Sequence, residues 1–207
     1  MCNTNTIEIN KQIFFRALNK VDKSYVNSSI PKLGKPAEEL VERVFAYELY
    51  RQWANLLEEE RSEFILNGEI RKIESRILRN PKNRTKYPDL VLHKGQWESE
   101  GNEIVCEIKR QSSINKIDNI VNDIEKLKFF INPRMKKVSY TSPYSLGILL
   151  VYGSEDNSSI FETIEKHKVK FKGLTPEEKG KILIVFLKYK DIEGPTIDSK
   201  PLSQMID

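Results

Sequence analysis

Residues 87–109 decide the fold of this chain and read YPDLVLHKGQWESEGNEIVCEIK. Polar and apolar residues alternate in both flanks of this stretch, as they do in half-buried β-strands. The nine residues between the flanks contain two glycines and can close a hairpin. Alternation places Asp89 on one face of the first strand, and it places Glu107 and Lys109 together on one face of the second. The stretch therefore predicts a hairpin that holds two carboxylates and an ammonium group side by side.

The composition indicates a folded domain with a core of its own. The chain has 207 residues, of which 39% are hydrophobic, so one domain with a small appendage is expected. Basic residues number 34 and acidic residues 30, which gives a net charge of +4. Such a small excess permits a polyanionic partner without requiring one.

Cysteine content and hydropathy bear on where the protein works. The two cysteines, Cys2 and Cys106, are too few for a disulfide framework, which favours a reducing compartment. The N-terminus has no basic segment followed by an apolar run, so no signal peptide is predicted. The longest apolar runs, around residues 146–152 and 182–187, are too short to cross a bilayer. We therefore expect a cytoplasmic protein with no membrane partner.

Helical and strand-like periodicity alternate along the chain. Residues 1–35 are expected to form a helical extension and a linker, residues 36–190 the main domain, and residues 191–207 a frayed tail. Helices are predicted at 7–21, 36–59, 110–131 and 155–170, and strands at 64–73, within 87–109, at 145–153 and at 181–190. This interleaving is typical of an α/β domain whose mixed central sheet is flanked by helices.

Glu48 is an acidic residue on the apolar side of the helix predicted at 36–59. At about 100° per residue it falls near the middle of an arc of apolar side chains, namely Leu40, Val41, Val44, Phe45, Tyr47 and Leu49. A carboxylate that faces the core is costly unless it is paired or binds a metal ion. Two interpretations stay open: Glu48 pairs with an arginine at the rim, or the helix delivers it to a functional site.

Seven arginines and lysines lie between Arg71 and Lys86. A solvated basic loop is the commoner fate of such a run. Its place directly before the Asp89 strand also suits contacts to phosphate groups. Arg110, Gln111 and Ser112 follow Lys109 at the end of the second strand and have two equally weighted interpretations, a contact to a phosphate group and an exposed turn with a helix cap. The candidates for nucleic-acid binding are Arg71, Lys72, Arg84, Lys86, Arg110 and Gln111.

The acidic pair of the hairpin carries ligands of the type that Mg²⁺ prefers. A water molecule bound to such an ion has a lowered pKa and becomes a nucleophile for a phosphodiester. Lys109 can orient or deprotonate this water, or it can offset charge in the transition state. Glu48 can hold a second metal ion or hydrogen-bond Lys109. Together with Asp89 and Glu107, these residue types suit metal-assisted phosphodiester hydrolysis.

The spacing of these residues resembles the signature of the PD-(D/E)XK nuclease superfamily, which includes many restriction endonucleases. Pro88-Asp89 is followed, after seventeen residues, by Glu107-Ile108-Lys109. The resemblance implies a restriction-endonuclease-like αβββαβ core, and the predicted elements follow that order from about residue 36 to about residue 152. The stretches YELYRQW and NGEIRK also resemble uncharacterised bacterial members.

The resemblance also implies roles for individual residues. Asp89 and Glu107 would bind Mg²⁺, for which Mn²⁺ can substitute, and the backbone carbonyl of Ile108 would be a further ligand. Lys109 would be the catalytic lysine, and Glu48 the acid from the first core helix. The implied activity is that of a deoxyribonuclease, with an endonuclease favoured and RNA the less favoured substrate, because most members act on DNA.

Several other residues have plainer interpretations. His93 shares the strand face of Asp89 and could be a ligand, but a chain with only two histidines is not expected to hold a zinc site. Cys106 is expected to pack on the apolar face of its strand. Trp97 is expected to cover nearby strands rather than stack on a base. Glu42 and Glu69 are possible extra acids at the site, with surface placement favoured.

A second function from a different class stays open at this point. A domain of this kind can bind nucleic acid, or assemble into a defence or DNA-processing complex, without cleaving anything. A homodimer would suit double-strand cutting, although no interface is predicted.

Overall fold

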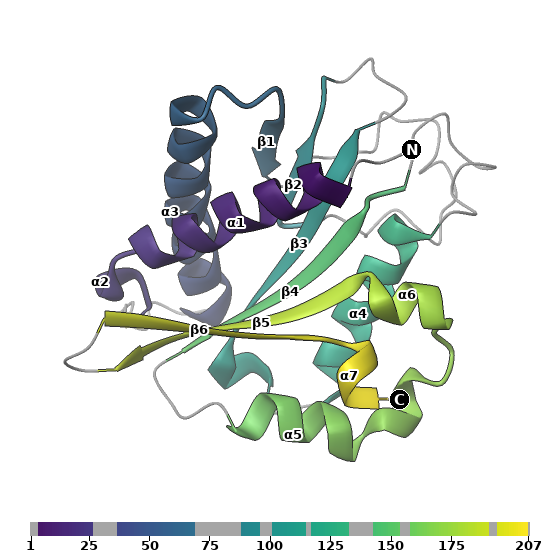
Figure 1. The fold of residues 1–207 in the computed structure, drawn as a ribbon. Helices are drawn as coiled ribbons and strands as arrows, with labels where there is room; N and C mark the ends of the chain where they lie inside the picture. The colour runs from purple at the N-terminus through teal and green to yellow at the C-terminus, as the bar shows by residue number, and fades with distance from the viewer. Residues whose placement is uncertain are drawn as a thin grey trace.

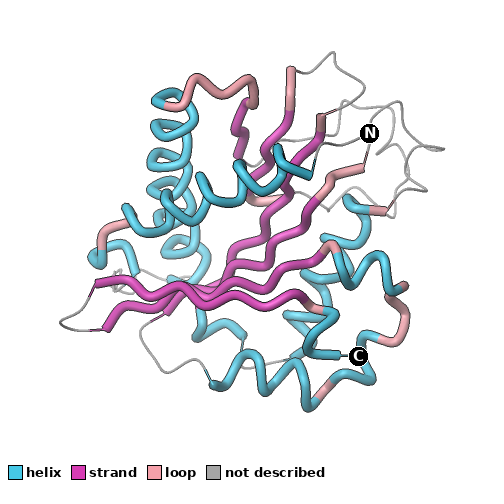
Figure 2. The backbone as a smooth tube through the Cα atoms, in the orientation of Figure 1, coloured by secondary structure: helices cyan, strands magenta, loops and turns pink. Residues whose placement is uncertain are grey.

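A six-stranded mixed β-sheet forms the centre of the protein in the computed structural model (Figure 1, Figure 2). The structure describes residues 4–26, 37–68, 88–95, 101–114, 117–132, 143–153, 158–190 and 194–206. Neighbours in the sheet follow the order of the sequence, and the strands are β1 (Ile65–Gly68), β2 (Leu90–His93), β3 (Asn102–Arg110), β4 (Leu146–Gly153), β5 (Ile182–Lys190) and β6 (Gly194–Pro201).

Strand direction changes across the sheet. β1, β2 and β3 are antiparallel neighbours, β3, β4 and β5 are parallel, and β6 is antiparallel to β5. Because parallel neighbours need a crossover, α4 (Ile117–Ile131) connects β3 to β4, and α5 (Ser158–Lys166) and α6 (Pro176–Gly180) lie between β4 and β5. This arrangement confirms the predicted α/β class with a mixed sheet flanked by helices.

The helices α1 (Thr4–Lys20), α2 (Lys23–Val26) and α3 (Ala37–Glu59) pack over one face of the sheet. Leu90, Cys106 and Ile148 point to this face, where they share one apolar core with Phe14 of α1 and Trp53 of α3. The burial of Cys106 in this core agrees with its predicted packing role. Because α1 is part of the main core, it is a layer of the domain rather than an appendage.

A second core lies on the opposite face, under α4, α5 and the short helix α7 (Ser203–Ile206). Val91, Val105 and Leu149 point to this face, one residue out of phase with the side chains that point to the first core. The alternation follows from the two-residue period of a strand. The register of β2 and β3 is consistent with these two faces, because Leu90 lies opposite Cys106 and Val91 lies opposite Val105.

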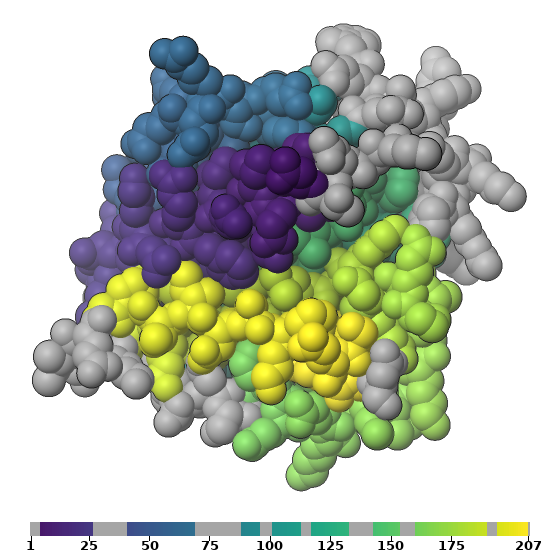
Figure 3. Space-filling view, viewed as in Figure 1, coloured from purple at the N-terminus to yellow at the C-terminus, as the bar shows by residue number. Residues whose placement is uncertain are grey.

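The C-terminal segment corrects the prediction of a frayed tail over residues 191–207. β6 pairs with β5 along its whole length, and Leu202, Met205 and Ile206 are buried in the second core. In Figure 3 this segment, in yellow, lies directly beside α1, in purple. The sequence of β6 is GPTIDSKP, and its two prolines and polar residues obscured the strand pattern. An edge strand tolerates such residues because one of its sides has no ladder to complete.

The remaining elements are short. Gln111–Ile114 (η4) and Lys168–Phe171 (η6) are turns of 3₁₀ helix, and a capping box between Thr175 and Glu178 begins α6. The predicted linker at 22–35 contains α2, and the rest of it lies outside the described residues, as does the part of the predicted strand 64–73 beyond Gly68. Within the described chain, no helix is long and apolar enough to span a bilayer.

Candidate functional site

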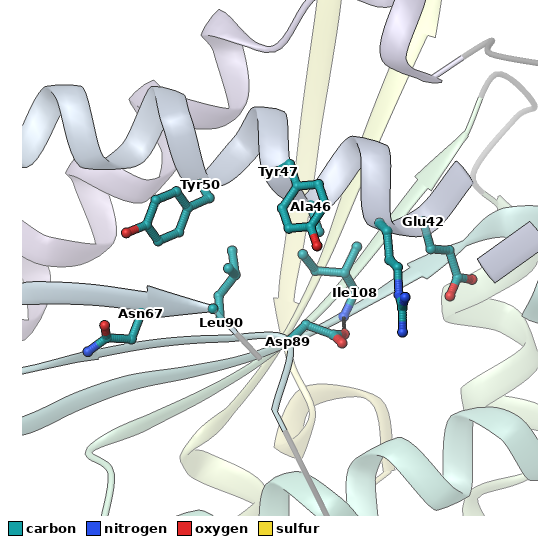
Figure 4. Close-up of a pocket in the computed structure, with 10 residues that line it drawn as sticks. Glu42, Ala46, Tyr47, Tyr50, Asn67, Asp89, Leu90 and Ile108 are labelled. Atoms are coloured by element: carbon teal, nitrogen blue, oxygen red, sulfur yellow. Dashed lines mark hydrogen bonds between the residues drawn. The ribbon is translucent and has the colours of Figure 1, made fainter. Parts of the chain in front are cut away.

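The predicted hairpin brings Asp89 and Glu107 together. Asp89 directly precedes β2, and continuing the register that pairs Leu90 with Cys106 places Asp89 alongside Glu107 of β3. Asp89 Oδ2 accepts a hydrogen bond of 2.7 Å from the backbone N–H of Ile108, which ties the start of β2 to β3 (Figure 4). Burial raises the pKa of Asp89, although this hydrogen bond and nearby ammonium groups oppose the shift.

Glu107 is a fully buried carboxylate. Its Oε2 accepts a hydrogen bond from Nζ of Lys126 on α4, whereas its Oε1 has no hydrogen-bond partner among the described residues. Burial, reinforced by the charges of Asp89 and Asp123, raises the pKa of Glu107 well above its ordinary value, and Lys126 offsets part of this shift. A buried carboxylate with an unsatisfied oxygen is costly, which is typical of a ligand site rather than of packing.

Lys109 lies among carboxylates from two helices. Its Nζ is 3.7 Å from Oε2 of Glu42 on α3 and 3.9 Å from Oδ2 of Asp123 on α4. Burial alone would lower the pKa of Lys109, but Asp123, Glu42 and then the hairpin carboxylates outweigh it, and the pKa rises. Lys109 therefore carries a proton at neutral pH, which suits a role in stabilising negative charge better than a role as a base.

Asp123 is a site residue that the sequence analysis missed. The residue is 6% exposed, and its Oδ2 has no hydrogen-bond partner among the described residues. Burial raises the pKa of Asp123 to about 6, against the opposing charges of Lys109 and Lys126. Asp123 follows the apolar position 120 by one helical turn, so the same signal that marked Glu48, an acid on an apolar stripe, would have found it.

Glu42, rather than Glu48, is the acid that α3 brings to Lys109. Oε1 of Glu42 accepts a 3.1 Å hydrogen bond from the backbone N–H of Arg110. One turn along the helix, Phe45 stacks on Tyr152 of β4 with ring centroids 3.8 Å apart, which holds α3 over this end of the sheet. The preference for a surface position of Glu42 was therefore wrong, since its side chain is largely buried at the cluster.

Glu48 is buried elsewhere and does not reach the cluster. Its carboxylate accepts hydrogen bonds of 2.7 and 2.9 Å from Arg51 and one of 2.7 Å from Gln52. The hydrogen bond from Arg51 outweighs burial and lowers the pKa of Glu48. Glu48 and Glu42 differ by about 120° around the helix, so the contacts of α3 with the sheet can direct only one of them to Lys109. The first interpretation, pairing with an arginine, matches these contacts.

Only some of the other predicted site residues lie in the part of the chain that the structure describes. Glu69, Arg71, Lys72, Arg84, Lys86 and Trp97 lie outside the described residues. Arg110 ends β3, and Gln111 begins η4 with its side chain packed against Gly153 of β4. His93 Nε2 lies 2.6 Å from Nδ2 of Asn67.

A pocket of about 520 Å³ opens beside this cluster, between α3 and the β1–β3 end of the sheet (Figure 4). Glu42 and Asp89 of the cluster line this pocket, together with Ile108, whose backbone N–H is bonded to Asp89. Figure 4 shows Tyr47 and Tyr50 extending from α3 over the strands. The remaining lining residues are Arg43, Ala46, Asn67, Gly68 and Leu90.

The charge of the cluster suits a divalent cation, although its carboxylates are not already arranged as a set of metal ligands. Four carboxyl groups, from Glu42, Asp89, Glu107 and Asp123, meet the ammonium groups of Lys109 and Lys126. Burial with this excess of acid raises the pKa of three of the four carboxyl groups, and a bound cation would relieve that cost. Among the described residues, however, no group of three or more His, Cys, Asp or Glu side chains is already arranged to hold a metal ion.

Comparison with known proteins adds no relative to this description. No family model, no curated protein and no solved structure matches the chain.

Proposed function

We propose that this protein is a Mg²⁺-dependent nuclease that hydrolyses phosphodiester bonds, with DNA as its substrate. The observation that carries the proposal is the meeting of Asp89, Glu107 and Lys109 on one face of the β2–β3 hairpin. Buried acids with raised pKa values next to a pocket are typical of catalytic sites. A hairpin that served only packing would bury apolar side chains at these positions.

The order of elements supports the same proposal. α3, β1, β2, β3, α4 and β4 follow one another as helix, three strands, helix and strand, which is the order expected of a restriction-endonuclease-like core. The acidic pair lies on the second and third strands of that series, where the PD-(D/E)XK resemblance requires it. The proposed fold family rests on this agreement between motif and element order.

Asp89 and Glu107 would hold the metal ion, with the backbone carbonyl of Ile108 as the further ligand that the resemblance implies. Bound there, Mg²⁺ supplies positive charge to the phosphate and lowers the pKa of a coordinated water. The ion would compete with Lys126 for Glu107, because one carboxylate oxygen is already bonded to that ammonium group. The second oxygen of Glu107 remains available among the described residues.

Lys109 would act on the phosphate through its charge. Its raised pKa keeps it protonated, so it stabilises the negative charge that develops on the phosphate oxygens in the transition state. Glu42 and Asp123 position the ammonium group from both sides, at 3.7 and 3.9 Å. Positioning of this kind matters because a charge stabilises the transition state only where it already points at the reacting group.

Cleavage of supercoiled plasmid DNA tests the proposal. Wild-type protein should nick or cut the plasmid with Mg²⁺ or Mn²⁺ and should be inactive in EDTA. Lys109→Met and Asp89→Asn should each lower the rate by about 100-fold or more, the loss expected when a charge that stabilises the transition state is removed. The matched controls Lys166→Met and Asp118→Asn replace exposed residues on α5 and α4, and both should cleave as the wild type does. Full activity of the Lys109→Met protein would refute the mechanism.

The pairing of Lys126 with Glu107 favours one alternative, a nucleic-acid-binding module that does not cleave. An ammonium group that already neutralises a buried carboxylate removes part of the need for a metal ion. Calorimetric titration with Mg²⁺ separates the two functions. A nuclease should bind Mg²⁺, and Glu107→Gln should abolish that binding. A protein that binds no Mg²⁺ but binds DNA with a steep salt dependence would be the module instead.

A further inference from the structure

We propose that the pocket between α3 and the β1–β3 end of the sheet binds an unpaired nucleobase, so that the preferred substrate is single-stranded or locally unpaired DNA. The proposal rests on the nuclease function, because it places the base next to the phosphate held at Asp89. It goes beyond that function by assigning the pocket a ligand and the enzyme a substrate class.

Two tyrosines, one helical turn apart on α3, form the roof of the pocket. Tyr47 is 64% exposed, an unusual position for a large aromatic ring, and it makes no ring or cation contact with any described residue. Figure 4 shows its ring directed from α3 toward Ile108 and Asp89. An aromatic ring that is left open over a pocket provides a face on which a planar ligand can stack.

Tyr50 is held in place by the sheet. Its hydroxyl group donates a hydrogen bond of 3.2 Å to the backbone carbonyl of Leu66 in β1, so its ring is fixed before any ligand enters. Fixing the ring in advance lowers the entropy lost on binding. Tyr50 therefore forms a rigid part of the pocket wall, whereas Tyr47 is the accessible stacking surface.

The size and the polar groups of the pocket suit a nucleoside. Its volume of about 520 Å³ lies in the range of small-molecule sites, which is roughly 300–1,000 Å³. The amide of Asn67 and the guanidinium of Arg43 add polar groups to the wall, and the carboxylates of Glu42 and Asp89 line the side that borders the cluster. Unpaired bases are recognised by this combination of stacking rings and polar groups at their edges.

The base must be unpaired to use this pocket. In a duplex both faces of each base are covered by its stacked neighbours, so a tyrosine ring can reach a face only after the base leaves the stack. Asp89 lines the pocket and also belongs to the carboxylate cluster. A base bound under Tyr47 is therefore part of a nucleotide at or next to the cleaved phosphate. Duplex DNA would have to open there first.

Fluorescence anisotropy in EDTA, where no cleavage occurs, measures this binding directly. The probes are a single-stranded oligodeoxythymidine of about 12 residues, the same strand annealed to its complement, and an abasic strand of equal length. The variants are Tyr47→Ala and Tyr47→Phe, and the matched control is Val44→Ala, an exposed apolar residue of the same helix that does not line the pocket. Equal melting temperatures establish that all the variants are folded.

We expect Tyr47→Ala to weaken binding of the single strand by about 5- to 150-fold, the range found when one base loses an aromatic stacking partner. Tyr47→Phe and Val44→Ala should stay within about twofold of the wild type, because the first keeps the ring and the second changes a residue outside the pocket. Duplex and abasic strands should bind more weakly to the wild type and should respond little to Tyr47→Ala.

An equal loss of affinity for single strand and duplex, or no loss for the single strand, would overturn the pocket assignment. Neither result would affect the proposed nuclease function, which depends on plasmid cleavage and its loss in the Lys109→Met and Asp89→Asn variants. Conversely, a protein that cleaves nothing but binds single strands through Tyr47 would refute the nuclease and retain the pocket. The two proposals therefore fail separately.

Discussion

Replacing Asp123 with asparagine should reduce the loss of stability that the metal-free protein undergoes between acid and neutral pH. The folded protein raises the pKa of this carboxyl group from 3.8 to about 6, because the group is buried on α4. Between these two values the unfolded chain loses the proton while the folded protein keeps it, so stability falls as the pH rises from about 4 to about 6. At neutral pH the accumulated cost is about 3 kcal/mol, since one pKa unit corresponds to about 1.4 kcal/mol.

Part of this cost is already present at about pH 4.5, which leaves about 2 kcal/mol between about pH 4.5 and about pH 7.5. Asp123→Asn removes the titrating group and should remove that part of the pH dependence. Urea unfolding of both proteins in EDTA at the two pH values measures it as a difference of differences. Any effect of the new amide on stability that does not depend on pH cancels in this comparison.

Asp118→Asn is the matched control on the same helix. The hydrogen bond from Lys170 lowers the pKa of Asp118, so this variant should change the pH dependence in the opposite direction and by a small amount, because the side chain is exposed. If Asp123→Asn keeps the full pH dependence of the wild type, Asp123 is not the buried acid described above. The charge balance of the cluster would then need revision.

Two further substitutions test the packing around the site and the C-terminus. Gly153→Ala would place a Cβ atom 2.7 Å from Cβ of Gln111 and should lower the free energy of unfolding in urea by about 1–3 kcal/mol. The control Gly180→Ala adds a Cβ atom that meets nothing within 4 Å and should cost nothing. Equal stabilities of the two variants would contradict the close packing of η4 on β4. Leu202→Ala should lower the free energy of unfolding by about 2–5 kcal/mol, because Leu202 is fully buried in the second core. The control Val169→Ala replaces an exposed residue and should change stability by less than about 0.5 kcal/mol. A Leu202→Ala protein as stable as the wild type would mean that the C-terminal segment does not contribute to the core.

The α/β class and the hairpin were predictable because both follow from local patterns. Alternation of polar and apolar residues over residues 87–109 specifies two strands, and a strand's period of two specifies which side chains share a face. The meeting of Asp89 with Glu107 follows from that register and is what the structure has. Mg²⁺ binding and DNA cleavage stay predictions, because they depend on chemistry that the fold alone does not establish.

β6 was missed for an equally physical reason. Its polar, proline-containing sequence has no strong preference for a strand, and it becomes one because β5 presents a free edge and the buried Leu202 anchors the C-terminal end of the segment. A segment whose structure comes from its neighbour carries little signal of its own. Long-range pairing of this kind is visible only after the rest of the sheet is known.

The local sequence of about twenty consecutive residues thus determines the hairpin that carries Asp89 and Glu107. The surroundings of Lys109 depend instead on how the helices pack. A helix can present any side to the sheet, and the side is chosen by which apolar arc fits the core, as Phe45 does against Tyr152. That choice turns Glu42 toward Lys109, whereas Glu48 is left to pair with Arg51 on its own helix. The packing of α4 likewise brings Asp123 and Lys126 to the site. The periodicity of the sequence shows that a helix has an apolar side. Which polar residue lies at the edge of that side, next to the site, depends on how the helix is rotated about its axis, and only the packing of both cores against the sheet determines that rotation.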